Sequence, residues 1–312
     1  MKLKTIALTL IGISSITALP ATAKDLYMLS HFPDSNSHNE LGTINLETKE
    51  YKKLEDVTAG AGLEVANQKI YITISSGSEF SLWTTNLDGS DAQIFNNVPF
   101  AGSMPISVNK NTDDVYISSY QQDAIAQIYP DYSGTPGGPV EGEDYTLVFH
   151  PVEEGCKAGC DPTATAIDEE NERFYFALGT GESTKIMSSA LGDDTTVDRS
   201  EELTEADGLN HTEHYHKINA INIDPKSKYM YFSNEHSIFR AKINKKNPQV
   251  ELLYTTDYTL GINDMVVDFE TDTIYWTLDE DKKLYSSDIN GNNVEVVFES
   301  EDKVMYQLAF RK

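Results

Sequence analysis

Basic residues are scarce in this chain of 312 residues. It carries 24 Lys and Arg against 50 Asp and Glu, which gives a formal net charge of -26 at pH 7. Proteins that bind nucleic acid by neutralising phosphates need a basic surface, so this composition excludes that class of partner. The surplus of negative charge favours cations or basic partners instead.

Cysteine is almost absent as well. The only two cysteines lie in the run Cys156-Lys157-Ala158-Gly159-Cys160. Two thiols this close, with a glycine between them to permit a tight turn, predict a small disulfide loop in an oxidising compartment. One cysteine pair supplies half of a structural zinc site and lacks the haem-attachment spacing, so a redox or metal role is the less favoured alternative.

Long apolar runs are missing beyond the first 23 residues. Residues 1–23 read as a signal peptide: Lys2 and Lys4 give a positive start, an apolar run follows, and Ala21-Thr22-Ala23 predicts cleavage after residue 23. The alternative is a membrane anchor, but the run is shorter than the roughly 20 apolar residues that a spanning helix needs. We therefore predict a periplasmic or secreted protein without membrane insertion. Loss of the two lysines takes the net charge from -26 to -28.

Common catalytic and calcium motifs are lacking too. The chain has no nucleophile elbow around a serine, no His-Glu-x-x-His zinc motif and no match to the twelve-residue calcium loop. The acidic run Asp279-Glu280-Asp281 is therefore interpreted as a solvated surface.

What the chain does contain is an internal repeat. Hydrophobic residues make up 39% of it and tyrosine alone contributes 17, which is ample for a packed core. The repeat aligns six tyrosines spaced 44, 45, 59, 56 and 44 residues apart, namely Tyr27, Tyr71, Tyr116, Tyr175, Tyr231 and Tyr275. A period in the forties is typical of β-propellers.

The last complete repeat shows the layout best. Four short strands are predicted at 265–268, 273–277, 284–289 and 294–298, separated by polar turns. The turn at Asn290-Gly291 is a strong hairpin signal. We therefore predict an all-β chain whose single domain, residues 24–312, is a six-bladed propeller with four-stranded blades.

The two ends of the predicted domain complement each other. The first repeat begins at Asp25 without an inner strand, whereas residues 304–310 form an inner strand with nothing after it. We expect the C-terminal strand to join the first blade and close the ring. A pair of β-sandwiches is the alternative, but it predicts neither the regular spacing nor the complementary ends.

The repeat resembles the YWTD repeat of low-density-lipoprotein-receptor class B propellers. The chain as a whole resembles a bacterial-type exported propeller of this kind. The residues that carry the likeness are Ile274-Tyr275-Trp276-Thr277, Leu87-Asp88-Gly89-Ser90-Asp91 and Tyr231-Phe232-Ser233-Asn234. The Asp that follows Thr in the family is replaced here by Leu278. The resemblance implies a recognition surface rather than a catalytic one.

Histidines gather on one predicted face. Placed on the repeat, all seven fall in the loops around one end of the channel, and the densest cluster is His211, His214 and His216. Neutral imidazoles on a short segment suit Zn or Cu. Against this interpretation, exposed loops carry polar residues in any protein.

The chain also resembles, more weakly, the gluconolactonase-type propellers. That resemblance implies a divalent cation such as Ca²⁺, held at the starts of the inner strands. The matching positions with suitable oxygens are Asn219, Asn263 and Asp264, and Glu64 or Asp161 are further donors.

Two functions follow from these observations. The favoured one is an exported propeller that binds an unknown protein or small molecule on the loop face around the channel, with no certain cofactor. The alternative is a divalent-metal-dependent lactonase or related hydrolase at the channel mouth.

Overall fold

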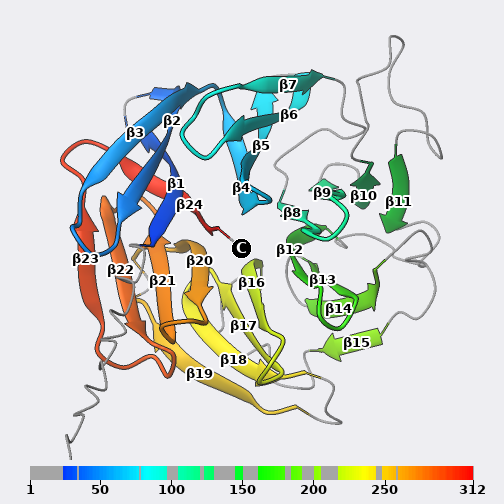
Figure 1. The fold of residues 1–312 in the computed structure, drawn as a ribbon. Helices are drawn as coiled ribbons and strands as arrows, with labels where there is room; N and C mark the ends of the chain where they lie inside the picture. Colours follow the sequence, from blue (N-terminus) through cyan, green and yellow to red (C-terminus); the bar gives the residue numbers. More distant parts are fainter. Residues whose placement is uncertain are drawn as a thin grey trace, which may run out of the picture.

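The computed structural model describes residues 24–33, 35–76, 79–96, 105–119, 123–129, 145–149, 161–179, 184–191, 200–204, 217–243, 248–257 and 259–311. Over these residues, 24 strands form six antiparallel four-stranded sheets arranged as blades around a central axis (Figure 1). The predicted six-bladed β-propeller is confirmed. The predicted signal peptide and the cysteine loop at Cys156 and Cys160 lie outside the described residues.

Blades are numbered in chain order, and the strands of each blade are named from the innermost to the outermost. Blade 1 consists of β24 (Val304–Phe310), β1 (Asp25–Phe32), β2 (Ser35–Asn45) and β3 (Tyr51–Val57). Blade 2 consists of β4 (Gly60–Ala66), β5 (Lys69–Ser76), β6 (Glu79–Asn86) and β7 (Gln93–Asn96). Blade 3 consists of β8 (Ile106–Val108), β9 (Val115–Ser119), β10 (Ala124–Ile128) and β11 (Tyr145–Phe149).

The second half of the ring follows the same plan. Blade 4 consists of β12 (Pro162–Asp168), β13 (Arg173–Leu178), β14 (Lys185–Ala190) and β15 (Ser200–Leu203). Blade 5 consists of β16 (Ile218–Asp224), β17 (Tyr229–Asn234), β18 (Ser237–Lys242) and β19 (Val250–Thr255). Blade 6 consists of β20 (Ile262–Asp268), β21 (Thr273–Leu278), β22 (Lys283–Asp288) and β23 (Glu295–Glu299). Among the described residues there is no helix with the length and apolarity needed to cross a membrane.

The last strand closes the ring, as predicted. β24 pairs antiparallel with β1, and Phe310 lies opposite Leu26. Each inner strand also contacts the inner strand of the next blade all the way round, from β24 to β4, β8, β12, β16, β20 and back. Because the first blade is built from both ends of the domain, the ring cannot open without breaking a sheet.

The hydrophobic core is divided among the interfaces between blades. The described residues form six buried clusters, and each cluster combines side chains from two neighbouring blades. The tyrosine of every repeat lies on the second strand of its blade and is buried. The repeat is therefore a packing repeat, since it places an aromatic ring at the same point of each interface.

The inner strands share one irregularity that positions the functional site. A β-bulge interrupts the pairing of the first two strands in five blades, and the residue left without a partner is Ala61, Thr163, Asn219, Asn263 or Tyr306. Two of these five residues, Asn219 and Asn263, are predicted ligands, and the third predicted ligand, Asp264, directly follows one of them. A bulge turns the extra residue away from the regular pleat, so it redirects these side chains near the start of each inner strand.

Candidate functional site

The face of the propeller on which the bulges lie contains a pocket of about 650 Å³. We call this side the loop face and the cavity the mouth pocket. Its walls come from blades 1, 2 and 6, which meet here because β24 and β4 follow β20 around the axis. The lining residues are His31, Asn39, Gly60, Thr259, Leu260, Gly261, Asn263, Asp279, Glu280 and Tyr306.

One wall of the mouth pocket is aromatic. The ring of Tyr306, the bulged residue of β24, lies 5.5 Å from the ring of His31 between centroids. The Tyr306 hydroxyl donates a hydrogen bond of 3.0 Å to the carbonyl oxygen of Gly60, and the side-chain amide of Asn39 donates to the same oxygen at 3.4 Å. Burial raises the pKa of Tyr306, so its phenol stays neutral. These contacts hold the aromatic wall in place.

A second wall is acidic. Asp279 and Glu280 form the turn between β21 and β22, and both side chains are exposed. The backbone amide of Asp279 donates to the carbonyl of Gly261 at 2.7 Å, and the side-chain amide of Asn263 donates to the Asp279 carboxylate. Gly261 has no side chain to keep this carboxylate away, because a Cβ there would lie 2.8 Å from Asp279 Oδ2.

The surroundings of Asp279 disfavour its charge. Although the residue is exposed, partial desolvation of its carboxyl by the surrounding protein raises the pKa, and the neighbouring negative charge of Glu280 raises it further. Lys217, the hydrogen bond from Asn263 and His236 act in the opposite direction, but the net shift is upward. The pocket therefore has one more carboxylate than the nearby lysine can balance.

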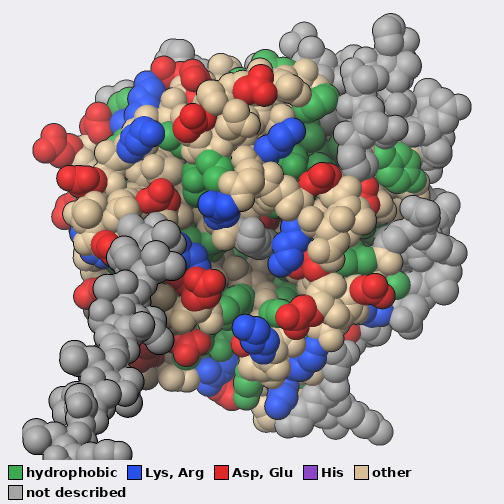
Figure 2. Space-filling view, in the orientation of Figure 1, with side chains coloured by type: hydrophobic (Ala, Val, Ile, Leu, Met, Phe, Trp, Pro, Cys, Tyr) green, Lys and Arg blue, Asp and Glu red, His purple; other side chains and the backbone are tan. Residues whose placement is uncertain are grey.

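A second cavity, of about 330 Å³, is the central channel, which opens on the opposite face. It is lined by all six inner strands, and Lys24, Lys110 and Arg311 lie around it. Figure 2 shows Lys and Arg side chains bordering the hollow at the centre of the ring, with acidic side chains spread over the blades around them. Lys24 pairs with Asp268 at 2.7 Å and Lys110 with Glu169 at 3.4 Å. These two cations are therefore already neutralised by nearby acids.

Two of the predicted ligands, Asn219 and Asp264, line the channel. The Asn219 amide donates to the carbonyl of Ile262 at 2.6 Å. Asp264 accepts the backbone amides of Met265 at 2.8 Å and Leu308 at 2.7 Å, one with each carboxylate oxygen. Both side chains thus satisfy polar backbone groups of inner strands, including those of the neighbouring blade, which is what an otherwise unpaired sheet edge requires.

Asp264 has the most perturbed environment of the predicted ligands. It is buried, and burial raises its pKa to about 7. The two backbone hydrogen bonds lower the pKa, and the negative charge of Glu64, which also lines the channel, raises it. The channel therefore disfavours the charged form of this carboxyl.

The third predicted ligand, Asn263, faces a different cavity. It lines the mouth pocket and binds Asp279, whereas Asn219 and Asp264 line the channel. Because both carboxylate oxygens of Asp264 already accept backbone amides, these three residues do not fit a preformed calcium site, which gathers six or more oxygens. Within the described ranges, no three His, Cys, Asp or Glu side chains are grouped to hold a metal.

The predicted histidine cluster at His211, His214 and His216 lies outside the described residues, so the Zn or Cu site stays a prediction. The side chains of two other histidines of the same predicted face are described. His31 lines the mouth pocket, and His236 lies close enough to Asp279 to influence its pKa. His31 therefore belongs to the aromatic wall of the mouth pocket, and His236 lies near the acidic wall.

The acidic wall was not predicted from the sequence. Asp279 and Glu280 are exposed, as the solvated-surface interpretation expects, yet both line the pocket. Asp281, the third residue of that run, instead accepts a hydrogen bond of 2.5 Å from the Tyr285 hydroxyl. The signal that could have found the wall was position, because the run lies at the tip of a hairpin directed toward the loop face.

Several solved structures share this fold. The chain aligns with a structure of a nidogen/laminin complex at a TM-score of 0.67 and 14% identity, covering 91% of this chain and 98% of that one. TolB from Acinetobacter baumannii gives a TM-score of 0.68 at 10% identity, and the alignment covers 93% of this chain and 67% of TolB. A candidate 6-phosphogluconolactonase from Bacteroides fragilis gives 0.58 at 10% identity, with 94% and 99% covered.

These likenesses establish the propeller fold and nothing finer, because the identities are low. No family model matches the sequence. No curated protein matches it either.

Proposed function

We propose that this chain is an exported recognition propeller that binds a ligand or a protein partner on its loop face. The observation that carries the proposal is the mouth pocket, a cavity of about 650 Å³ assembled from the first two blades and the last blade of the ring. Ligand sites are concave, with a few polar groups converging on them, and this pocket has both properties. The nidogen structure is that of a complex with laminin, which agrees with binding as a use of this fold.

Export is part of the proposal and rests on residues 1–23. Mass spectrometry of the protein recovered from the medium or periplasm of an expressing bacterium tests it. Cleavage after Ala23 supports export, whereas an intact N-terminus on a protein retained in the cytoplasm contradicts it.

The alternative function, a metal-dependent lactonase, draws support from the candidate 6-phosphogluconolactonases of similar fold. The side chains proposed for the cation are engaged with the backbone or face separate cavities. We therefore treat hydrolysis as a competing outcome of the binding experiment.

A matched pair of substitutions tests the binding function. Thr259 and Thr271 are both exposed, but Thr259 lines the mouth pocket, whereas Thr271 lies in the β20–β21 turn at the opposite end of blade 6. Wild type, Thr259→Trp and Thr271→Trp are screened by thermal shift against a panel of amino-acid amides, polyamines, short peptides and sugar lactones. Lactone hydrolysis is measured in parallel, with and without added Ca²⁺, Mg²⁺ and Zn²⁺.

A panel compound that stabilises wild type and Thr271→Trp but not Thr259→Trp supports binding at the mouth pocket, because indole at position 259 fills the cavity. Three results contradict it: no compound stabilises the wild type, binding is lost in Thr271→Trp alone, or a lactone is hydrolysed in a metal-dependent way.

A further inference from the structure

We propose, resting on the binding function above, that the mouth pocket takes a positively charged group: an alkylammonium or guanidinium ion carried on a slender apolar stem. The feature behind this inference is a juxtaposition across one cavity. Carboxylates of blade 6 form one wall, and the rings of Tyr306 and His31 form another. The two walls offer different and complementary interactions to such a group.

The acidic wall supplies the charge. Lys217 and His236 are the described groups whose charge acts to lower the pKa of Asp279, but the net shift is upward, and among the described residues Glu280 has no ion pair. Lys53 and Lys303 of the neighbouring blade are engaged by Glu40 at 3.4 and 2.6 Å. A cation entering the pocket therefore meets uncompensated negative charge. Hydrogen bonds from a cation to a carboxylate are about twice as strong as neutral ones.

The position of Asp279 increases this attraction. The residue is exposed, but the backbone of Gly261 and the amide of Asn263 lie against it, and partial desolvation of the carboxylate raises its pKa. Ion pairs strengthen as the local dielectric falls, so a cation that replaces the lost water stabilises the charged carboxylate.

The aromatic wall suits the rest of the ligand. The ring of Tyr306 is fixed through its hydroxyl, which donates to the carbonyl of Gly60 at 3.0 Å. A fixed ring offers a face to a cation or to the methylene groups that carry it. Leu260 adds an apolar surface, and Asn263 adds an amide oxygen that can accept a hydrogen bond from the cation.

Volume and net charge agree with this ligand class. A cavity of about 650 Å³ accommodates a lysine or arginine side chain together with part of the backbone that bears it. A protein of net charge -26 also attracts cations over a distance, which accelerates their encounter at low ionic strength.

Isothermal titration calorimetry with defined probes tests the inference. The charged probes are Nα-acetyl-L-arginine methylamide and Nα-acetyl-L-lysine methylamide, and the neutral counterparts carry citrulline and norleucine. Agmatine represents a small free amine. We expect the charged probes to bind at least about tenfold more tightly than the neutral ones, and more weakly at high salt.

Charge-neutralising variants locate the site. Asp279→Asn and Glu280→Gln remove the two carboxylates of the acidic wall. Glu295→Gln makes the same charge change at an exposed residue of β23, outside the pocket. We expect the first two variants to weaken the arginine probe about tenfold or more and Glu295→Gln to leave its affinity unchanged. Unfolding midpoints verify that all three variants fold.

The outcomes separate this inference from the proposed function. Preference for the blocked arginine or lysine over agmatine supports a side chain of a protein partner as the natural cation, and equal binding of agmatine supports a small amine. Equal binding of arginine and citrulline, or unchanged affinity in Asp279→Asn and Glu280→Gln, overturns the charge inference while the panel experiment still stands. If no compound of either experiment binds, both fall.

Discussion

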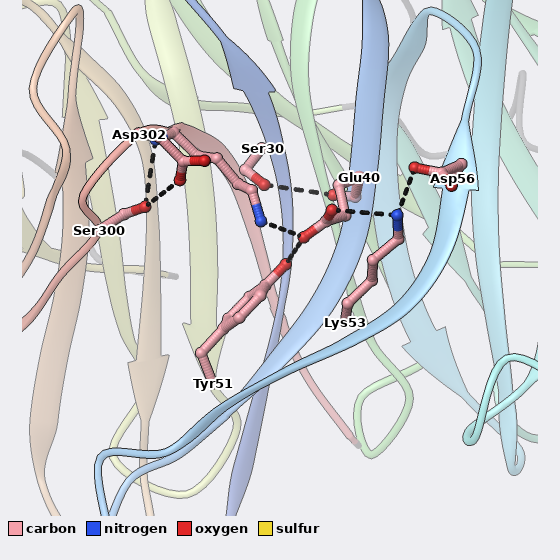
Figure 3. A network of polar contacts seen from close by, with 8 residues as sticks. Ser30, Glu40, Tyr51, Lys53, Asp56, Ser300 and Asp302 are labelled. Carbon is pink, nitrogen blue, oxygen red and sulfur yellow. Dashed lines mark hydrogen bonds and ion pairs between the residues drawn. The ribbon is translucent and has the colours of Figure 1, made fainter.

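Lys303 and Glu40 are 263 positions apart in the sequence, and their side chains meet at 2.6 Å. Lys303 directly precedes β24, whereas Glu40 lies on β2 of the same blade. Figure 3 shows that the Tyr51 hydroxyl and the Lys53 amine converge on the same carboxylate, and Lys53 also pairs with Asp56 at 2.7 Å. The Glu40 side chain is 4% exposed. This network ties the last strand of the chain to the first blade.

Replacing Lys303 with Met should destabilise the closed ring. The change removes a charged hydrogen bond to a buried carboxylate, which is worth about 1.5–3 kcal/mol, while Tyr51 and Lys53 still hold Glu40. Lys52→Met is the matched control, because Lys52 is exposed on β3, the strand next to the one that carries Glu40. Urea unfolding measures both variants, and equal midpoints for the two would contradict a stabilising role of the pair.

The same carboxylate predicts how stability depends on pH. Burial alone would raise the pKa of Glu40, but hydrogen bonds from Lys303 and Tyr51 outweigh it and hold the pKa below its ordinary value of 4.5. Its contribution to stability is therefore present above pH 4.5 and lost as the pH falls through the lowered value. We expect acid unfolding of Glu40→Gln to show a shallower pH dependence than that of wild type in this range.

Asp264 should show the opposite dependence. Its pKa of about 7, against the ordinary aspartate value of 3.8, means that the folded protein holds this proton more tightly than the unfolded chain. Its contribution to stability therefore decreases from about pH 4 to about pH 7 and is constant above.

Asp264→Asn tests this dependence. Asparagine supplies one acceptor for two backbone amides, so one buried amide is left unsatisfied and the variant should lose about 1–3 kcal/mol. The difference between wild type and Asp264→Asn should shrink as the pH rises from 5 to 8, since only wild type carries the titrating group. Denaturant midpoints at several pH values measure it, and a widening gap would refute the assigned sign.

Two glycines of the outer turns allow a matched comparison. Gly89 and Gly291 both have positive φ, at 87° and 79°, and each packs against the outer strand of the preceding blade. A Cβ at Gly89 would lie 3.1 Å from the Leu54 carbonyl oxygen, whereas one at Gly291 would overlap the Leu253 carbonyl. Gly89→Ala should lose about 1 kcal/mol and Gly291→Ala more. Thermal unfolding ranks the pair.

Gly261 links the shape of the mouth pocket to its charge. Alanine at this position would place a Cβ 2.8 Å from the Asp279 carboxylate, so the carboxylate must move. The backbone of Gly261 is not in the left-handed region, and the side chain that has to shift is exposed. We expect Gly261→Ala to weaken the arginine probe several-fold with little change in unfolding midpoint. A large loss of stability with unchanged affinity would count against the placement of Asp279.

The fold could be predicted from the sequence because it depends on a local pattern of strands and turns that repeats along the chain. The spacing from Tyr231 to Tyr275 indicates a blade, and each of the six repeat tyrosines is buried at an interface between blades. Ring closure could be predicted as well. The first blade lacks an inner strand and the chain ends with one extra strand, so the extra strand completes the first blade. Phe310 lies opposite Leu26, as this complementarity requires.

The site was predicted only in part, because equivalent positions in a repeat need not have equivalent surroundings. Asn219 and Asn263 occupy equivalent bulges in neighbouring blades. Asn219 nevertheless donates a hydrogen bond to the backbone of β20, whereas Asn263 donates one to Asp279. Which partner a bulged side chain meets depends on the next blade, and the sequence does not specify that contact locally.

The sequence by itself determined the blade count, the packing tyrosines, the closing strand and the negative charge, all of which follow from periodicity and composition. Only the tertiary structure decided that Asp264 accepts a hydrogen bond from the backbone of β24 and that Tyr306 and Asp279 line the same cavity. The physical reason is distance along the chain: a pocket formed where blades 6, 1 and 2 meet exists only after the ring has closed.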